Sequence, residues 1–231
     1  HLLAYFHMLQ RDVLRFQAAY VAADVLPLGS GALAGVPYQI DREFVARELG
    51  FTRISENSLD AVSDRDFLLD YQHAAATCMM HLSRLAEEVV LWSSEEFGFL
   101  RLADEYTTGS SMMPQKRNPD FAELARGKTG RVYGHLVGIL TILKSLPLTY
   151  NRDLQEDKEA LFDTVDTLFS TMEAFARMVE RASFDRERMA KATSTGYLLA
   201  TDLADYLVRK GLPFRQAHSV LTELTSYAAA H

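Results

Sequence analysis

The 231 residues of the chain are enough for one large domain, or for one domain and part of a second. Apolar residues make up 48% of the chain and charged residues 24%, which excludes an intrinsically disordered protein. The formal net charge of −7 argues against nucleic acid or an anionic membrane as the main partner. The sequence also has no apolar run that is long and charge-free enough to span a membrane.

The first predicted helix runs from the beginning of the chain to about Asp24, because apolar residues recur there at helical spacing. This pattern is already under way at the first residue, and another is unfinished over residues 226–231. We therefore expect the chain to be a fragment of a longer protein. A loop rich in glycine and proline follows over residues 27–35, and a short helix is predicted over residues 41–49.

A second long helix is predicted from about Ser63 to about Phe97. Its apolar stripe contains Cys78, the single cysteine of the chain, which therefore cannot form a disulfide within it. A lone cysteine in this position is expected to be a small, buried, apolar side chain. It also favours a reducing, cytoplasmic compartment for the protein.

Residues 107–118 are predicted to form a loop that leads into the next helix. Pro119 suits the first turn of that helix with Asn118 as its N-cap, and Pro147 ends it after about Leu146. Each interior glycine of a helix costs about 1 kcal/mol relative to alanine. We expect close helix packing along one face to compensate at four glycines: Gly127, Gly130, Gly134 and Gly138.

Further helices are predicted over residues 157–181, over 199–210 and from Pro213 onward. No segment shows the sustained alternation of a strand, so the predicted fold class is all-α, a bundle of long helices. We assign residues 1–192 to this bundle and residues 193–231 to the beginning of a small C-terminal helical domain. Apolar residues on more than one face of the long helices indicate burial against other subunits.

Three local patterns lack the context that their usual functions require. Residues 29–31 resemble the start of a dinucleotide fingerprint but follow a predicted helix instead of a strand. Residues 127–129 resemble the end of a phosphate-binding loop, yet they lie within a helix and Ala122 stands where a glycine is required. The seven histidines have no metal-binding spacing, so no metal ion is predicted.

Residues 108–120 combine groups that can hold a carboxylate and stabilise the charge formed when a neighbouring proton is removed. Gly109 permits close approach of a substrate, and the following helix N-terminus offers free N–H groups. A serine in such surroundings can act as a base if its pKa is lowered. The alternative is a flexible surface loop with a helix cap, and spacing alone does not separate the two. The polar residues concerned are Ser110, Ser111, Lys116, Arg117 and Asn118.

Residues 109–119 resemble the signature Gly-Ser-Ser-x-Met-Pro-x-Lys-x-Asn-Pro of the fumarase/aspartase superfamily at every fixed position. The resemblance implies a long-helix bundle of the fumarase/aspartase type, assembled as a homotetramer with composite active sites. It also implies that Ser110 is the proton-abstracting base, with Ser111 as the alternative. Lys116 and Asn118 would bind a substrate carboxylate.

Residues 146–159 resemble the motif Leu-Pro-x-x-Tyr-Asn-x-Asp-Leu-Gln-Glu-Asp-Lys-Glu of the argininosuccinate lyase family. The resemblance implies that Tyr150, Gln155 and Lys158 contact the substrate, through directional hydrogen bonds and a carboxylate ion pair. The implied reaction is β-elimination of argininosuccinate to arginine and fumarate in arginine biosynthesis, without a cofactor. The alternative for this segment is a polar loop between helices whose charges are solvated.

Residues 25–32, 63–67 and 200–211 also resemble segments of this family. Arg65 either helps to order the site or forms a structural ion pair. Glu123 is either the acid that partners a catalytic histidine or an ordinary first-turn acid favoured by the helix dipole. The family segment Thr-x-x-Gln-x-Ala-Gln-Pro and its adjacent histidine are absent from this sequence, so we expect the chain alone to be inactive.

Other functions stay open at this point. One is a different fumarate-releasing lyase of the superfamily, such as adenylosuccinate lyase. Another is a non-catalytic structural homologue of the δ-crystallin kind. A third is a chain that serves only as an oligomerisation core.

Overall fold

The computed structural model describes residues 1–114, 116–194 and 198–230. The chain divides into two compact units, which are described separately. The bundle unit comprises His1–Leu91 and Leu102–Ala182, and the C-terminal unit comprises Trp92–Arg101 and Ser183–His231. The domain boundary after residue 192 stays a prediction.

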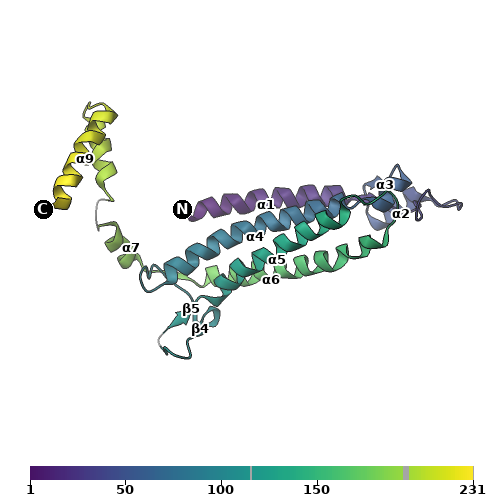
Figure 1. The fold of residues 1–231 in the computed structure, drawn as a ribbon, viewed down its shortest axis with the longest axis horizontal. Coiled ribbons are helices and arrows are strands. Elements are labelled where there is room, and N and C mark those ends of the chain that lie inside the picture. Colours follow the sequence, from purple (N-terminus) through teal and green to yellow (C-terminus); the bar gives the residue numbers. More distant parts are fainter. Residues whose placement is uncertain (115, 195–197, 231) are drawn as a thin grey trace. The chain divides into compact units, whose positions relative to one another are not determined.

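Four long helices lie side by side in the bundle unit (Figure 1): α1 (Leu2–Ala23), α4 (Asp66–Ser93), α5 (Asp120–Leu143) and α6 (Asp157–Glu180). The α4 helix brings a run of small residues, Ala74, Ala75 and Ala76, into the core with at most 6% of each exposed. Larger side chains fill the space around them, among them Met79, Val132, Ile139 and Met178. The predicted all-α bundle is confirmed. The prediction succeeded because helical periodicity over long segments is a robust signal.

The second long helix is shorter than the sequence predicts. A separate helix, α3 (Ser58–Ser63), precedes it, capped by the side chain of Asn57. The backbone then turns extended at Asp64, whose carboxylate accepts a hydrogen bond of 2.7 Å from the N–H of Asp66, where α4 begins. At the other end the helix stops at Ser93 instead of Phe97.

The loop predicted over residues 107–118 contains a short antiparallel pair, β4 (Thr108–Gly109) with β5 (Arg117–Asn118). Asn118 therefore lies in a strand, and Pro119 occupies the N-cap position of α5, so the predicted Asn118 cap is wrong. The helix ends at Leu143, a few residues before the predicted end, and Ser145 follows with a positive φ of 65°.

The four glycines of α5 do not pack against neighbouring helices of this chain. A Cβ added at any of them would meet no atom within 4 Å, so close packing within the chain does not explain them. Gly127, Gly130 and Gly134 lie on exposed parts of the helix. The prediction of close packing is therefore wrong for the chain by itself.

The short helix predicted over residues 41–49 is confirmed as α2 (Arg42–Leu49), with Asp41 as N-cap and Gly50 as a left-handed C-cap. The chain on either side of it forms a parallel pair, β1 (Val25–Leu26) with β2 (Arg53–Ile54). These elements gather at the end of the bundle where α1 ends and α4 begins (Figure 1).

A buried polar cluster joins α1 to α4. Asp12, which is 2% exposed, lies 2.7 Å from Nδ1 of His81 and accepts a 3.0 Å hydrogen bond from Arg15. Beside it, burial raises the pKa of the Cys78 thiol to about 12. The predicted buried role of Cys78 is therefore confirmed.

In the C-terminal unit, β3 (Leu100–Arg101) pairs antiparallel with β6 (Ser183–Phe184). The helix α7 (Arg186–Thr193), capped by Asp185, was not predicted. The helices α8 (Ala200–Arg209) and α9 (Phe214–Ala230) match the predicted ones closely and pack through Ala204, Ala217 and Leu221. Within the described part of the chain, none of the helices is long and apolar enough to cross a membrane.

Candidate functional site

The β4–β5 pair closes a loop that we call the serine loop, residues 110–116. Thr108 pairs with Asn118 and Gly109 pairs with Arg117, so both ends of the loop are fixed at the start of α5 (Figure 1). The Thr108 hydroxyl donates to the carboxylate of Asp120, which ties β4 to the first residue of the helix. Gln115, which belongs to the signature, lies outside the described residues.

Ser110 is half-buried, and its hydroxyl oxygen faces two backbone donors. The N–H groups of Met112 and Met113 each donate to Ser110 Oγ over 3.2 Å. Two such donors stabilise negative charge on the oxygen and so favour the deprotonated hydroxyl. The side chain of Ser111 is exposed.

The cations of the loop face solvent. Lys116 is exposed, and its backbone N–H donates to the carbonyl of Met113 over 3.0 Å, which tightens the loop. Arg117 lies with Nε 3.7 Å from a carboxylate oxygen of Asp104. Asn118 is half-buried in β5. The serine loop and β5 thus place Ser110, Lys116 and Asn118 in one short stretch of backbone at one end of the bundle.

The second predicted group of site residues follows the other end of α5. Thr149 has a positive φ of 85°, a strained conformation of the kind that clusters at functional sites. Asn151 fixes the turn by donating to the carbonyls of Pro147 and Thr149 over 3.0 and 3.3 Å. Tyr150, beside it, is 42% exposed.

Gln155 ends the short 3-10 helix η2 (Arg152–Gln155) with its side chain exposed. Lys158 lies in the first turn of α6, where its ammonium donates to the carbonyl of Leu154 over 3.3 Å and to the carboxylate of Asp157 over 3.1 Å. Its side chain is nevertheless 54% exposed, so it remains accessible from solvent.

The structure does not bring the two groups of predicted residues together within one chain. The serine loop precedes α5, and Tyr150, Gln155 and Lys158 follow it (Figure 1). A helix rises 1.5 Å per residue, so the 24 residues of α5 separate the two groups by roughly 36 Å. A substrate of the size of an amino-acid derivative cannot span that distance.

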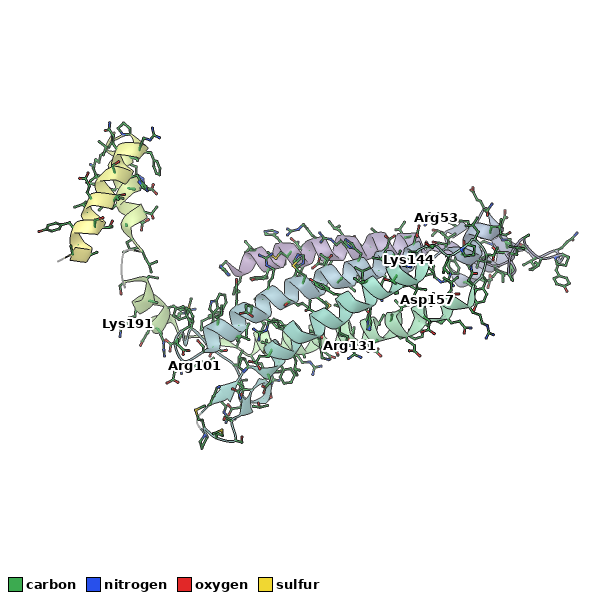
Figure 2. All side chains as sticks on the ribbon, viewed as in Figure 1. Arg53, Arg101, Arg131, Lys144, Asp157 and Lys191 are labelled. Carbon is green, nitrogen blue, oxygen red and sulfur yellow. The ribbon has the colours of Figure 1, made fainter. Side chains whose placement is uncertain are left out.

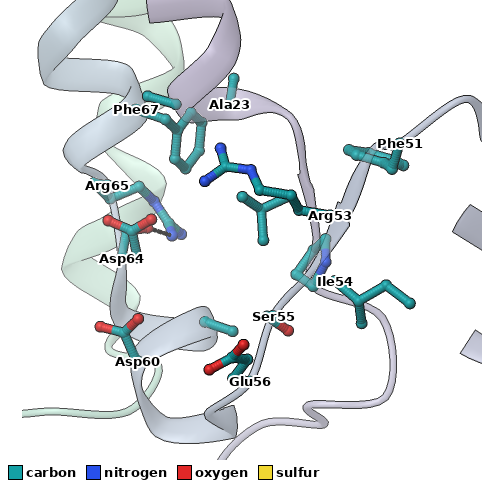
Figure 3. Close-up of a pocket in the computed structure, with 14 residues that line it drawn as sticks. Ala23, Phe51, Arg53, Ile54, Ser55, Glu56, Asp60, Asp64, Arg65 and Phe67 are labelled. Atoms are coloured by element: carbon teal, nitrogen blue, oxygen red, sulfur yellow. Dashed lines mark hydrogen bonds between the residues drawn. The ribbon is translucent and has the colours of Figure 1, made fainter.

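Two cavities lie at the end of the bundle beside the second group. The larger, of about 670 Å³, is lined by charged side chains that include Arg53, Glu56, Asp60, Asp64 and Arg65 (Figure 3). The smaller, of about 250 Å³, shares Asp60, Asp64 and Arg65 with it and adjoins the residues from Leu146 to Thr149. Burial raises the pKa of the Asp64 carboxyl, even though the N–H of Asp66 donates to it.

Sequence reasoning missed Asp157 as a member of this region. Its side chain is 2% exposed and its Oδ2 accepts a 2.5 Å hydrogen bond from Nε of Arg65. The ion pair predicted as one alternative for Arg65 is therefore present. The motif of residues 146–159 contains Asp157 beside Lys158. The sequence does not relate Asp157 to Arg65, because the two residues are far apart in the chain.

A protein-family model described as "Lyase" matches residues 1–134, and a second, described as "Argininosuccinate lyase C-terminal", matches residues 197–231. The chain belongs to this lyase family. An argininosuccinate lyase from Dehalococcoides mccartyi is 65% identical over 230 residues, which cover 100% of this chain and 50% of that protein. The predicted resemblance to argininosuccinate lyases is thereby confirmed, and the chain spans about half the length of the curated relatives it matches.

Solved structures agree on the fold. The crystal structure of EDDS lyase in complex with formate superimposes with a TM-score of 0.88 at 30% identity, covering 99% of this chain and 46% of that one. A class II fumarase from Schistosoma mansoni superimposes with a TM-score of 0.85 at 20% identity, covering 99% of this chain and 51% of that one. The predicted bundle of the fumarase/aspartase type is confirmed.

Proposed function

We propose that this chain forms part of an argininosuccinate lyase, which splits argininosuccinate into arginine and fumarate by β-elimination. The observation that carries the proposal is the pair of backbone N–H groups, from Met112 and Met113, that donate to Ser110 Oγ. A serine is a weak base unless its alkoxide is stabilised, and these donors supply that stabilisation. The identity of 65% with an argininosuccinate lyase supports the choice of substrate.

In the proposed reaction Ser110 Oγ takes the proton from the Cβ of the succinyl group. The electron pair left on carbon is stabilised through the adjacent carboxylate, which Lys116 and Asn118 bind. It then forms the double bond of fumarate while the bond to the guanidino nitrogen breaks. An acid group from outside this chain protonates the leaving nitrogen, and no cofactor takes part. The half-buried position of Ser110, with Ser111 exposed, favours Ser110 as the base.

We further propose a homotetramer whose active sites combine residues of different subunits. The separation of roughly 36 Å along α5 supports this proposal, because Ser110 and Lys158 of one chain are too far apart to contact one small substrate. Exposed apolar side chains on the bundle supply surfaces for such assembly, including Phe162 and Phe169 on α6. The exposed glycines of α5 would allow a helix of another subunit to approach closely.

In a composite site Tyr150, Gln155 and Lys158 contact the substrate. The exposed side chain of Lys158 suits a carboxylate, and Tyr150 and Gln155 offer directional hydrogen bonds.

We also propose a cytoplasmic location, and a domain boundary between residues 192 and 193.

The test uses a protein that supplies the missing parts of the site. We define the joined lyase as this chain fused to the parts of the Dehalococcoides mccartyi relative that it does not cover. Purified joined lyase is incubated separately with argininosuccinate and adenylosuccinate, and fumarate release is measured. Release from argininosuccinate is the expected result. Release from adenylosuccinate alone would assign a different superfamily lyase, and a folded assembly inactive on both would indicate a crystallin-like structural role.

A further inference from the structure

Three charged side chains form a row at the start of α6, between the larger cavity and solvent. Nε of Arg65 donates to Oδ2 of Asp157 over 2.5 Å, and Nζ of Lys158 donates to Oδ1 of Asp157 over 3.1 Å. Exposure changes sharply along the row, from 15% for Arg65 and 2% for Asp157 to 54% for Lys158. The row therefore has a buried part, with Asp157 at the start of α6 (Figure 2), and an exposed end at Lys158.

The inner end of the row is held by a hydrogen bond to the backbone. Nη1 of Arg65 donates to the backbone carbonyl of Asp64 over 2.5 Å, and its side chain lies in the wall shared by the two cavities (Figure 3). Because Arg65 is fixed by a backbone group on one side, it fixes the carboxylate of Asp157 on the other. A buried carboxylate with a fixed orientation is a stable anchor for a flexible cation.

The outer end of the row has one hydrogen-bonding position to spare. An ammonium group has three N–H donors. In Lys158 two of them face Asp157 Oδ1 and the carbonyl of Leu154, at 3.1 and 3.3 Å. Among the described residues the Lys158 ammonium makes no other hydrogen bond, so the third N–H is available to a ligand. The row itself contains two cations and one carboxylate, and the ammonium of Lys158 is the cation at its exposed end.

We propose that Asp157, held by Arg65, is a positioning residue that sets the Lys158 ammonium in place to bind a substrate carboxylate. The inference rests on the proposed function, because it takes Lys158 as a substrate contact. A free lysine side chain samples many rotamers, and ordering it on binding weakens the affinity for the ligand. Asp157 removes that penalty by ordering the ammonium before the substrate arrives.

A double-mutant cycle in the joined lyase tests this inference. KM and kcat for argininosuccinate are measured for the parent, Asp157→Asn, Lys158→Met and the double variant. We expect Asp157→Asn to raise KM about tenfold while kcat changes little, because binding of substrate and transition state weakens equally. In the Lys158→Met background the same substitution should raise KM less than about twofold, since there is no ammonium left to position.

Two further variants are made, one as a control and one as a replacement for Asp157→Asn. Asp163→Asn is the matched control, because Asp163 also lies on α6 and pairs with an arginine, Arg131, and it should leave KM unchanged. If Asp157→Asn does not fold, Arg65→Lys replaces it in the cycle. That variant keeps the charge but loses the Nε donor, and it should raise KM only when Lys158 is present.

The outcomes separate the inference from the proposed function. An active parent in which Asp157→Asn raises KM equally with and without Lys158 would overturn the positioning role and leave the proposed function intact. An active parent in which neither Asp157→Asn nor Arg65→Lys alters KM would do the same. A folded parent that releases no fumarate from argininosuccinate overturns both.

Discussion

Ser110 and Lys158 lie at opposite ends of the same helix, α5, with roughly 36 Å of helix between them. Each is embedded in a local structure that suits chemistry on a carboxylate: two backbone donors at Ser110 Oγ, and an anchored ammonium at Lys158. We therefore predict that a site containing both residues draws them from two copies of the chain.

Mixing two impaired variants of the joined lyase tests this arrangement. Ser110→Ala and Lys158→Met are each expected to release little fumarate at a substrate concentration well below the KM of the parent, the first because it lacks the base and the second because its KM is raised. If the variants are unfolded and refolded together in equal amounts, a site combining two subunits is intact in about a quarter of cases. We therefore expect activity near a quarter of the parent. No recovery after verified subunit mixing would mean that each site takes both residues from one chain.

The Ser110→Ala variant also tests the identity of the base. Loss of a general base typically lowers kcat by about 10² to 10⁴-fold, and we expect a fall in that range with assembly unchanged. Ser111→Ala is the matched control and should stay close to the parent, because its exposed hydroxyl lacks the two donors that face Ser110. The reverse pattern in steady-state fumarate release would assign the base to Ser111.

The sequence predicts the long helices well because their apolar periodicity extends over many turns. It predicts their ends poorly where a single side chain decides them. The carboxylate of Asp64 bonds to the N–H of Asp66 and so delays the start of α4. The helix α7 was missed because it is short and has no buried residues, although Asp185 at its N-cap was a usable signal.

Only those parts of the candidate site that lie in a contiguous sequence motif could be predicted. Residues 109–119 form a contiguous motif, so Ser110, Lys116 and Asn118 could be named before the fold was known. The pairing of Arg65 with Asp157 joins residues that are 92 positions apart, and nothing in the local pattern relates them. The separation of Ser110 from Lys158 likewise follows from the straight course of α5 and not from either motif.

A stripe of apolar side chains on α6 provides a test of assembly. Phe162, Val165, Phe169 and Met172 recur on one face and are between 39% and 71% exposed. We expect Phe169→Asp to dissociate the joined lyase, because a buried unpaired carboxylate would oppose the contact. Size-exclusion chromatography with light scattering measures the change. Glu173→Ala, on the same helix but in an exposed ion pair with Arg177, should leave the mass unchanged. An unchanged mass for Phe169→Asp would place the subunit contact elsewhere.

The carboxylate of Asp24 fastens the end of α1 to the chain before β2, and its effect depends on pH. Thr52 donates to it twice, from N–H over 3.0 Å and from Oγ1 over 2.5 Å, and these bonds lower the pKa of Asp24 below 3.8. A folded pKa below the unfolded value means that the ionised group stabilises the fold above the unfolded pKa. That stabilisation is lost as the pH falls through the folded pKa.

Asp24→Asn should therefore lower the Tm of the joined lyase at neutral pH, and the difference from the parent should shrink once the pH falls below 3.8. Thr52→Val should give a smaller change of the same kind, because the backbone donor remains. A Tm difference that stays constant down to that acidic range would show that the charge of Asp24 contributes nothing to stability.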